Sequence, residues 1–141
     1  MKLTLLLTVC LALLLLCACQ KNNQPPVEQS DLLHHSFVLQ SLDGQNLDFQ
    51  PLPFMAFGEG MRVYGKTCNN FTGQGELKEG KLWVRNMAST RMLCVDQPLN
   101  QLEMLLAQML DSGADISLQG QQLTLRGHDH TLVFRLRDLV E

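Results

Sequence analysis

The sequence predicts a small, mainly β domain with one α-helix, folded as an antiparallel partial barrel or a curved sheet. Two observations carry this prediction. From residue 35 onward, short runs with apolar side chains are separated by turn residues at roughly ten-residue spacing. The segment 96–111 instead places its apolar residues three and four positions apart, as a helix does. A lone helix among hairpins has to cover an open sheet face or close one end of a partial barrel.

The first half of the domain is predicted to consist of strands joined by tight turns. The run 35–41 places Phe37 and Leu39 on one face, and Asp43-Gly44 is a turn signal after it. A hairpin is expected around Glu79-Gly80. The strands after the first are expected at 53–57, 61–65, 73–77 and 81–84, with 88–94 as a further extended segment.

The segment 96–111 is predicted to be an amphipathic helix. Asp96 suits the N-cap, Pro98 suits the first turn, and Gly113 suits the C-terminal stop. We expect its apolar stripe to be buried against strands. Three more strands are expected after the helix, at 114–118, 121–126 and 131–136. The stripe consists of Leu99, Leu102, Leu105, Leu106, Met109 and Leu110.

The N-terminus predicts a bacterial lipoprotein signal over residues 1–18. Lys2 supplies a positive charge, the run 3–16 is almost entirely apolar, and the small Ala18 directly precedes Cys19. The apolar run is shorter than the about 20 residues that a membrane-spanning helix needs. We therefore expect cleavage before Cys19 and acylation of its thiol and amine, which would anchor the chain without a transmembrane helix.

Three regions are expected: the signal at 1–18, a flexible tether at 19–30 and the folded domain at 31–141. The tether prediction rests on polar composition around Pro25 and Pro26. Gln20 next to the acylated cysteine favours the outer membrane, so the expected location is its periplasmic face in a Gram-negative bacterium.

The charge pattern excludes one class of partner. The formal net charge is −3, and the lysines and arginines are scattered without a basic stripe, so nucleic-acid binding is not expected. The expected partners are the membrane, through the lipid anchor, and an envelope protein, peptide or lipid ligand. We expect no cofactor.

Cys68 and Cys94 are the two cysteines that remain after the signal and the acylated residue. An exported chain meets an oxidising compartment, so an even pair predicts a disulfide. Two free buried thiols are the alternative. A metal site is less favoured, because neither cysteine has a CxxC or HxxxH partner nearby.

Two blocks of residues resemble the META domain family. The first holds Gly65, Cys68, Asn69, Phe71 and Gly73, and the second holds Thr90, Met92 and Cys94, followed by Glu103 on the predicted helix. The resemblance extends over about 31–140. It implies a small β-rich, barrel-like domain with one helix and expression under heat or envelope stress. It carries over no catalytic residues, so we expect Gly65, Asn69, Phe71, Gly73, Thr90, Met92 and Glu103 to be structural.

Candidate catalytic and metal-binding groups have simpler explanations. A cysteine nucleophile needs a nearby base, and the histidines lie near the tether or in turns. His128-Asp129-His130 has a spacing that could hold a metal, but a polar turn is the commoner explanation. His34 and His35 are adjacent, so on a strand they point to opposite faces.

Two structural questions stay open from the sequence. Glu103 either forms a surface salt bridge with Arg91 or belongs to a buried network. The methionines either fill a loosely packed core or form an adaptable binding surface. They are Met55, Met61, Met87, Met92, Met104 and Met109.

The favoured function is a non-enzymatic envelope lipoprotein that acts as a binding or interaction module. The alternative is an envelope hydrolase or thiol-dependent enzyme. The sequence shows no nucleophile–base spacing, which favours the first. A connected apolar surface would support binding, and a cleft with perturbed titratable groups would support catalysis.

Overall fold

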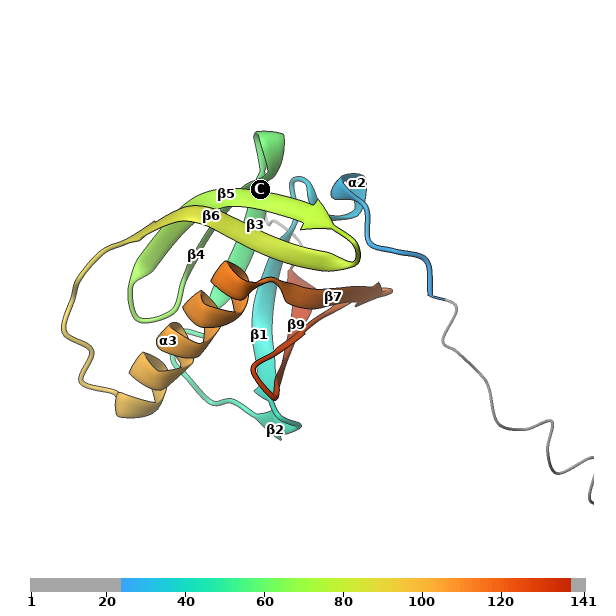
Figure 1. The fold of residues 1–141 in the computed structure, drawn as a ribbon. Helices are drawn as coiled ribbons and strands as arrows, with labels where there is room; N and C mark the ends of the chain where they lie inside the picture. The colour runs from blue at the N-terminus through green and yellow to red at the C-terminus, as the bar shows by residue number, and fades with distance from the viewer. Residues whose placement is uncertain (1–23, 138–141) are drawn as a thin grey trace, which may run out of the picture.

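Eight strands close into an antiparallel barrel in the computed structural model, which describes residues 24–137 (Figure 1). The ring runs β1-β3-β4-β5-β6-β7-β8-β9, and β9 pairs back with β1. The short β2 extends β1 as a hairpin outside the ring. The strands are β1 (Ser36–Leu42), β2 (Gln45–Asn46), β3 (Phe54–Gly58), β4 (Arg62–Lys66), β5 (Asn70–Lys78), β6 (Lys81–Ser89), β7 (Ala114–Gln119), β8 (Gln122–Gly127) and β9 (His130–Arg137). The helices are α2 (Gln29–Leu32), the 3-10 turn η2 (Glu59–Met61) and α3 (Gln97–Ser112).

The mainly β fold with one principal helix is confirmed, and the barrel is closed rather than partial. Closure depends on the pairing of β1 with β9, whose register runs from Ser36 opposite Arg137 to Leu42 opposite Leu132. Strand β1 places Phe37 and Leu39, two positions apart, in the core inside the ring.

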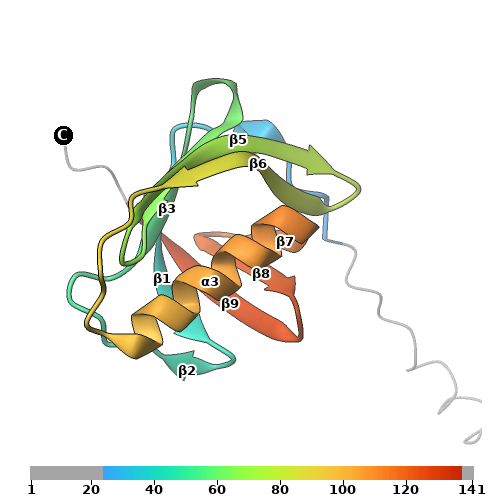
Figure 2. The same ribbon diagram turned by 60° about the vertical axis from the view of Figure 1, so that its left-hand side comes forward.

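The barrel is weakest between β6 and β7, and α3 lies at this seam. The two strands pair only at Lys81 with Asp115 and Leu82 with Ala114. Figure 2 shows α3 between β6 and the β8–β9 hairpin. Its stripe enters the core as predicted, because four of the six apolar residues are buried and the other two pack partly against it. The buried four are Leu102, Leu106, Met109 and Leu110.

The helix boundaries agree with the sequence. The Asp96 carboxylate accepts a hydrogen bond from the Leu99 N–H at 3.2 Å, which caps the helix, and Pro98 lies in its first turn. Gly113 ends the helix at φ +90°, and the Trp83 indole lies where its Cβ would be. Any other residue at this position would be strained and would displace the ring.

The expectation for 88–94 is wrong beyond Ser89. Strand β6 continues to Ser89, and residues 90–96, the clamped loop, then leave the sheet and lead into α3. Likewise β5 begins at Asn70, earlier than the expected 73, because its pairing with β6 shifts register at a bulge and continues beyond it.

Residues 24–30, expected in the tether, lie against the domain. The Gln24 side-chain amide donates to the Leu118 carbonyl at 2.6 Å, Val27 packs against the core, and α2 begins at Gln29. The predicted signal and Cys19 lie outside the described residues. None of the helices within 24–137 has the length and apolar character to cross a membrane.

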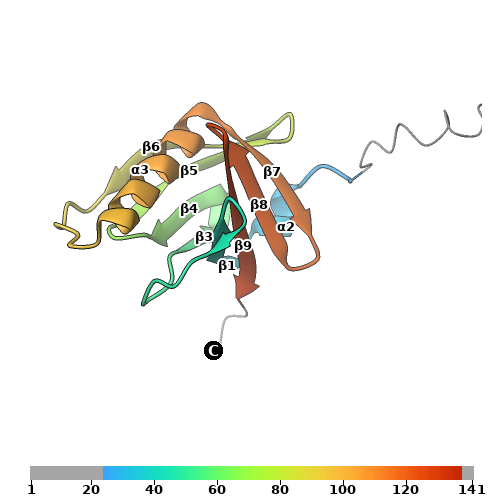
Figure 3. The same ribbon diagram turned by 90° about the horizontal axis from the view of Figure 1, so that it is seen from below.

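The N-terminal segment and the clamped loop lie at opposite ends of the barrel. Figures 1 and 3 place the blue segment that leads into α2 on one side and the yellow connection from β6 to α3 on the other. The two ends of the domain can therefore face different surroundings.

Candidate functional site

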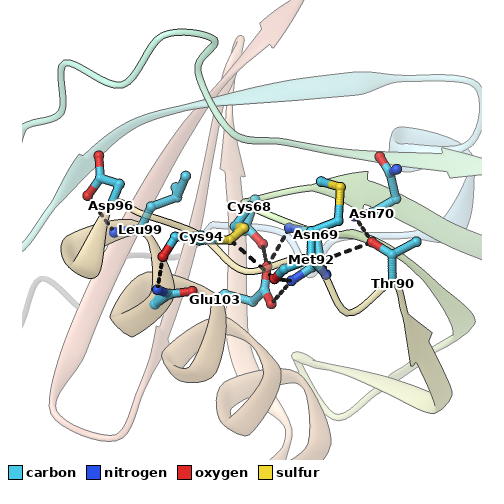
Figure 4. Close-up of a disulfide and its surroundings, with 11 residues drawn as sticks. Cys68, Asn69, Asn70, Thr90, Met92, Cys94, Asp96, Leu99 and Glu103 are labelled. Carbon is cyan, nitrogen blue, oxygen red and sulfur yellow. Dashed lines mark hydrogen bonds between the residues drawn. A yellow bond between two sulfur atoms is a disulfide. The ribbon is translucent and has the colours of Figure 1, made fainter.

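A disulfide between Cys68 and Cys94 ties the clamped loop to the barrel. Cys68 is buried in the connection from β4 to β5, and Cys94 lies in the loop just before α3. Their Cα atoms are 6.0 Å apart (Figure 4). The link holds together two segments that no strand pairing joins at this point.

The buried Asn69 side chain holds the same loop by hydrogen bonds. Its Oδ1 accepts from the Met92 backbone N–H at 2.7 Å and from the Thr90 hydroxyl at 2.9 Å. Its Nδ2 donates to the Met92 carbonyl at 3.5 Å. The Asn69 amide thus gives Met92 the partners that a neighbouring strand would otherwise supply.

Glu103 of α3 binds the residues next to the disulfide and thereby helps to hold the loop in place. Its Oε2 accepts from the Asn69 N–H at 2.7 Å and from the Thr67 hydroxyl, and its Oε1 accepts from Asn69 Nδ2 at 2.9 Å. Glu103 is half-buried and belongs to a hydrogen-bonded network, so the second alternative describes it better than the first, and no ion pair found within 24–137 joins it to Arg91.

The pKa of Glu103 is set by these contacts. Desolvation of the carboxylate raises the pKa, but hydrogen bonds from the Thr67 hydroxyl, the Asn69 backbone and side chain and the Cys68 N–H together outweigh it. The pKa is held below its ordinary value of 4.5. Glu103 is consequently a fixed anion at neutral pH.

The motif glycines and Phe71 have a packing role. Gly65 of β4 lies opposite Phe71 of β5, and a Cβ on Gly65 would lie 2.6 Å from the Phe71 ring. A Cβ on Gly73 would lie 2.5 Å from Val84 Cγ1, at the bulge of the β5–β6 pair. Both positions require glycine because neighbouring atoms occupy the space, and at Gly65 these include the Phe54 carbonyl oxygen.

The clamped loop exposes large apolar side chains. Leu93 is 99% exposed, Val95 is 98% exposed, and Met92 is 55% exposed. Val95 also lines a cavity of about 320 Å³ next to the disulfide, together with Leu99. These side chains do not stabilise the domain through burial, although their backbone is held in place.

Helix α3 borders two further cavities, one on each flank. The flank toward β1 and β2 borders a cavity of about 430 Å³ with mainly apolar walls, including Leu47, Phe49 and Leu105. Met104, 63% exposed, lies at its rim. The flank toward β6 borders a smaller cavity of about 190 Å³, described below.

The histidines lie away from the disulfide. His130 Nδ1 is 2.7 Å from Asp43 Oδ2, His128 Nε2 is 2.8 Å from Ser112 Oγ, and His34 Nε2 is 3.3 Å from Glu59 Oε1. The His130 hydrogen bond and the Thr131 N–H lower the pKa of Asp43. Across residues 24–137, no group of three His, Cys, Asp or Glu side chains is placed to hold a metal ion.

Sequence reasoning missed three residues of this site. Thr67 binds Glu103, and Leu93 and Val95 form the exposed surface. The position of Thr67 next to Cys68 was an available signal. No sequence signal showed that Leu93 and Val95 are exposed, because the sequence does not distinguish an exposed apolar residue from a buried one.

The fold and the clamp together define a small antiparallel β-barrel domain with one helix at its seam and a disulfide-held loop before that helix. The chain belongs to the META domain family, whose model matches residues 30–138. It is 40% identical over 129 residues to heat shock protein HslJ of Escherichia coli strain K12, a match that covers 90% of this chain and 91% of that protein.

Two solved structures are similar to this chain. One NMR structure is 39% identical, covers 82% of this chain and 99% of its own, and superposes with a TM-score of 0.74. An NMR structure of a protein from Burkholderia xenovorans shares the fold at a TM-score of 0.64. It has 20% identity and covers 86% of this chain and 97% of its own.

Proposed function

We propose that this protein is a stress-associated, lipid-anchored binding module of the bacterial envelope, and that the clamped loop is its main contact surface. The relative named as a heat shock protein supports the stress association. The order of Lys2, the apolar run 3–16, Ala18 and Cys19 supports the lipid anchor.

The observation that carries the proposal is the near-complete exposure of Leu93 and Val95 on a backbone that is held fixed. Soluble domains rarely gather exposed apolar side chains without a binding role. A loop already held in one conformation loses little entropy when a partner binds, so it binds more tightly than a free loop. The disulfide, Asn69 and Glu103 thus serve binding by ordering the loop beforehand.

The orientation of the domain favours a partner that is not the anchoring membrane. Cys19 precedes Gln24 by five residues, which span at most about 18 Å. Gln24 contacts the β7–β8 end of the barrel, whereas the clamped loop lies at the other end (Figure 2). An anchor at Cys19 would therefore present the loop away from the lipid surface.

The geometry gives less support to a thiol-dependent enzyme. The thiolate is the reactive form of cysteine, and here the two sulfurs are bonded to each other. The polar side chains of Asn69 and Glu103 beside the disulfide already use their hydrogen bonds in holding the loop. These contacts favour the binding module over the enzyme.

Photo-crosslinking in intact cells tests the proposal. A photoreactive amino acid at Leu93 of the full chain should give discrete cross-linked products after heat stress. The matched control carries the same group at Gln45, which is exposed on β2. Equal or weaker cross-linking from position 93 than from position 45 would overturn the proposal.

A further inference from the structure

We propose that the space between β6 and α3 binds an extended polypeptide segment, which adds to the free edge of β6 and inserts one apolar side chain beside the helix. This inference rests on the proposed function and names the class of partner. It places a second contact next to the clamped loop.

The edge of β6 is the first observation. Strand β6 pairs with β5 from Lys81 to Arg85 and again at Ala88 and Ser89, with a bulge between them, but it pairs with β7 only at Lys81 and Leu82. From Trp83 to Ser89, no described strand lies on its other side. On either side of the bulge, backbone N–H and C=O groups of alternate residues therefore point away from β5 without a strand partner.

The neighbouring helix does not replace the missing strand. Residues of α3 use their backbone groups within the helix, so α3 offers β6 side chains but no ladder of donors and acceptors. An added strand is the structure that satisfies such an edge. An acyl chain could fill the adjacent space but would leave the edge groups of β6 unpaired.

The cavity beside this edge is the second observation. It measures about 190 Å³ and is lined by Phe71, Met87, Leu106 and Ala107, with Thr67, Ser89 and Glu103 as its polar members. Sites for drug-sized ligands measure about 300–1,000 Å³, so this cavity suits a single side chain better than a whole small molecule.

Together, the edge and the cavity match a known mode of peptide recognition. In strand addition, main-chain hydrogen bonds provide affinity and a pocket for one side chain provides specificity. Met87 links the two features, because it belongs to β6 and also lines the cavity. The ionised Glu103 on the wall would repel an acidic residue, so the inserted residue should be apolar with uncharged or basic neighbours.

Selection from a random decapeptide library displayed on phage tests this inference. The target is the purified full chain in detergent micelles, and selected peptides are resynthesised for affinity measurement by fluorescence polarisation. We expect β-branched residues flanking one large apolar residue. Methylation of a backbone nitrogen that faces β6 should weaken binding by about tenfold or more, because it removes a main-chain hydrogen bond.

Two matched tryptophan variants locate the binding site. Ala107→Trp would fill the cavity beside β6 and should abolish binding. Gln101→Trp places the same side chain on the opposite flank of α3 and should leave the affinity unchanged. In the wild-type chain, peptide addition should shift the amide resonances of Met87, Ala88 and Ser89, a readout that does not depend on either variant folding.

Three results would overturn the inference. They are the absence of any selected peptide, equal affinities for the methylated and unmethylated forms, and amide shifts confined to residues outside β6 and α3. A further outcome separates this inference from the proposed function. If Leu93→Ser with Val95→Ser abolishes peptide binding while Ala107→Trp does not, the peptide binds the clamped loop. The strand-addition site would then be wrong and the binding module would stand.

Discussion

Asn69 shows how one buried amide can replace a strand. The loop residue Met92 lies beyond the end of β6, where its backbone groups have no ladder partner, and the Asn69 side chain supplies both a donor and an acceptor. Aspartate could accept but not donate here, so the geometry requires an amide. The resemblance to the family marked Asn69 as structural, but the sequence could not show which backbone groups it binds.

The ionised state of Glu103 predicts a pH dependence of stability. Its pKa lies below 4.5 in the folded domain, whereas the unfolded chain has the ordinary value. Between these two values the unfolded state binds more protons, so the free energy of unfolding falls as pH is lowered. This contribution is fully present above the unfolded pKa and is lost as pH falls through the folded pKa.

Thermal melts of Glu103→Gln should reveal this contribution. At neutral pH we expect a lower Tm than in the wild type, because the neutral amide accepts weaker hydrogen bonds from Thr67 and Asn69. Between about pH 5 and pH 3, the Tm of the variant should fall less than that of the wild type. Glu76→Gln, on an exposed position of β5, is the control. Parallel Tm–pH curves for the wild type and Glu103→Gln would contradict the role of this carboxylate.

At the scale of elements, α3 was predictable and the clamped loop was not. The helix could be predicted from local sequence features, namely the spacing of its apolar residues, the N-cap Asp96 and the C-terminal Gly113. The end of β6 depends on contacts with Asn69 and Cys68, which are distant in sequence. Local pattern therefore gave the correct helix and an extended segment that was five residues too long.

Truncation of the buried helix stripe should destabilise the domain. Leu102 and Leu106 are 3% and 5% exposed, so Leu102→Ala or Leu106→Ala should cost about 2–5 kcal/mol of unfolding free energy. Gln108→Ala, on the exposed side of the same helix, should change it by less than about 0.5 kcal/mol. Urea unfolding of the three variants measures these differences. Equally small effects in all three would mean that α3 does not close the core.

At the scale of the molecule, the closure of the barrel could not be predicted from the sequence. Alternation of apolar residues indicates that a segment is a strand in a sheet, but it does not show which strands pair with each other. The pairing of β1 with β9 joins the first and last strands of the domain. Closure matters for the proposed strand addition, because a closed ring leaves few free edges and β6 retains one beside α3.

The proposed lipid anchor also concerns the whole molecule. Mass spectrometry of the protein extracted from membranes should show an acylated N-terminus at Cys19, because the predicted signal would place this thiol at the cleavage site. The variant Cys19→Ala should move to the soluble fraction, since it removes the thiol that the proposed acylation requires. Retention of Cys19→Ala in the membrane fraction would contradict anchoring at this residue.

The central claim is that the loop at 90–96 is an ordered apolar surface and not a flexible linker. Backbone ¹⁵N relaxation of Leu93 and Val95 in the oxidised protein tests it most directly. We predict order parameters near about 0.85, the value of rigid backbone, and a clear decrease in Asn69→Ala, which removes the hydrogen bonds to Met92 while leaving the disulfide in place. Order parameters below about 0.6 in the wild type would show that the loop is mobile and would contradict the account.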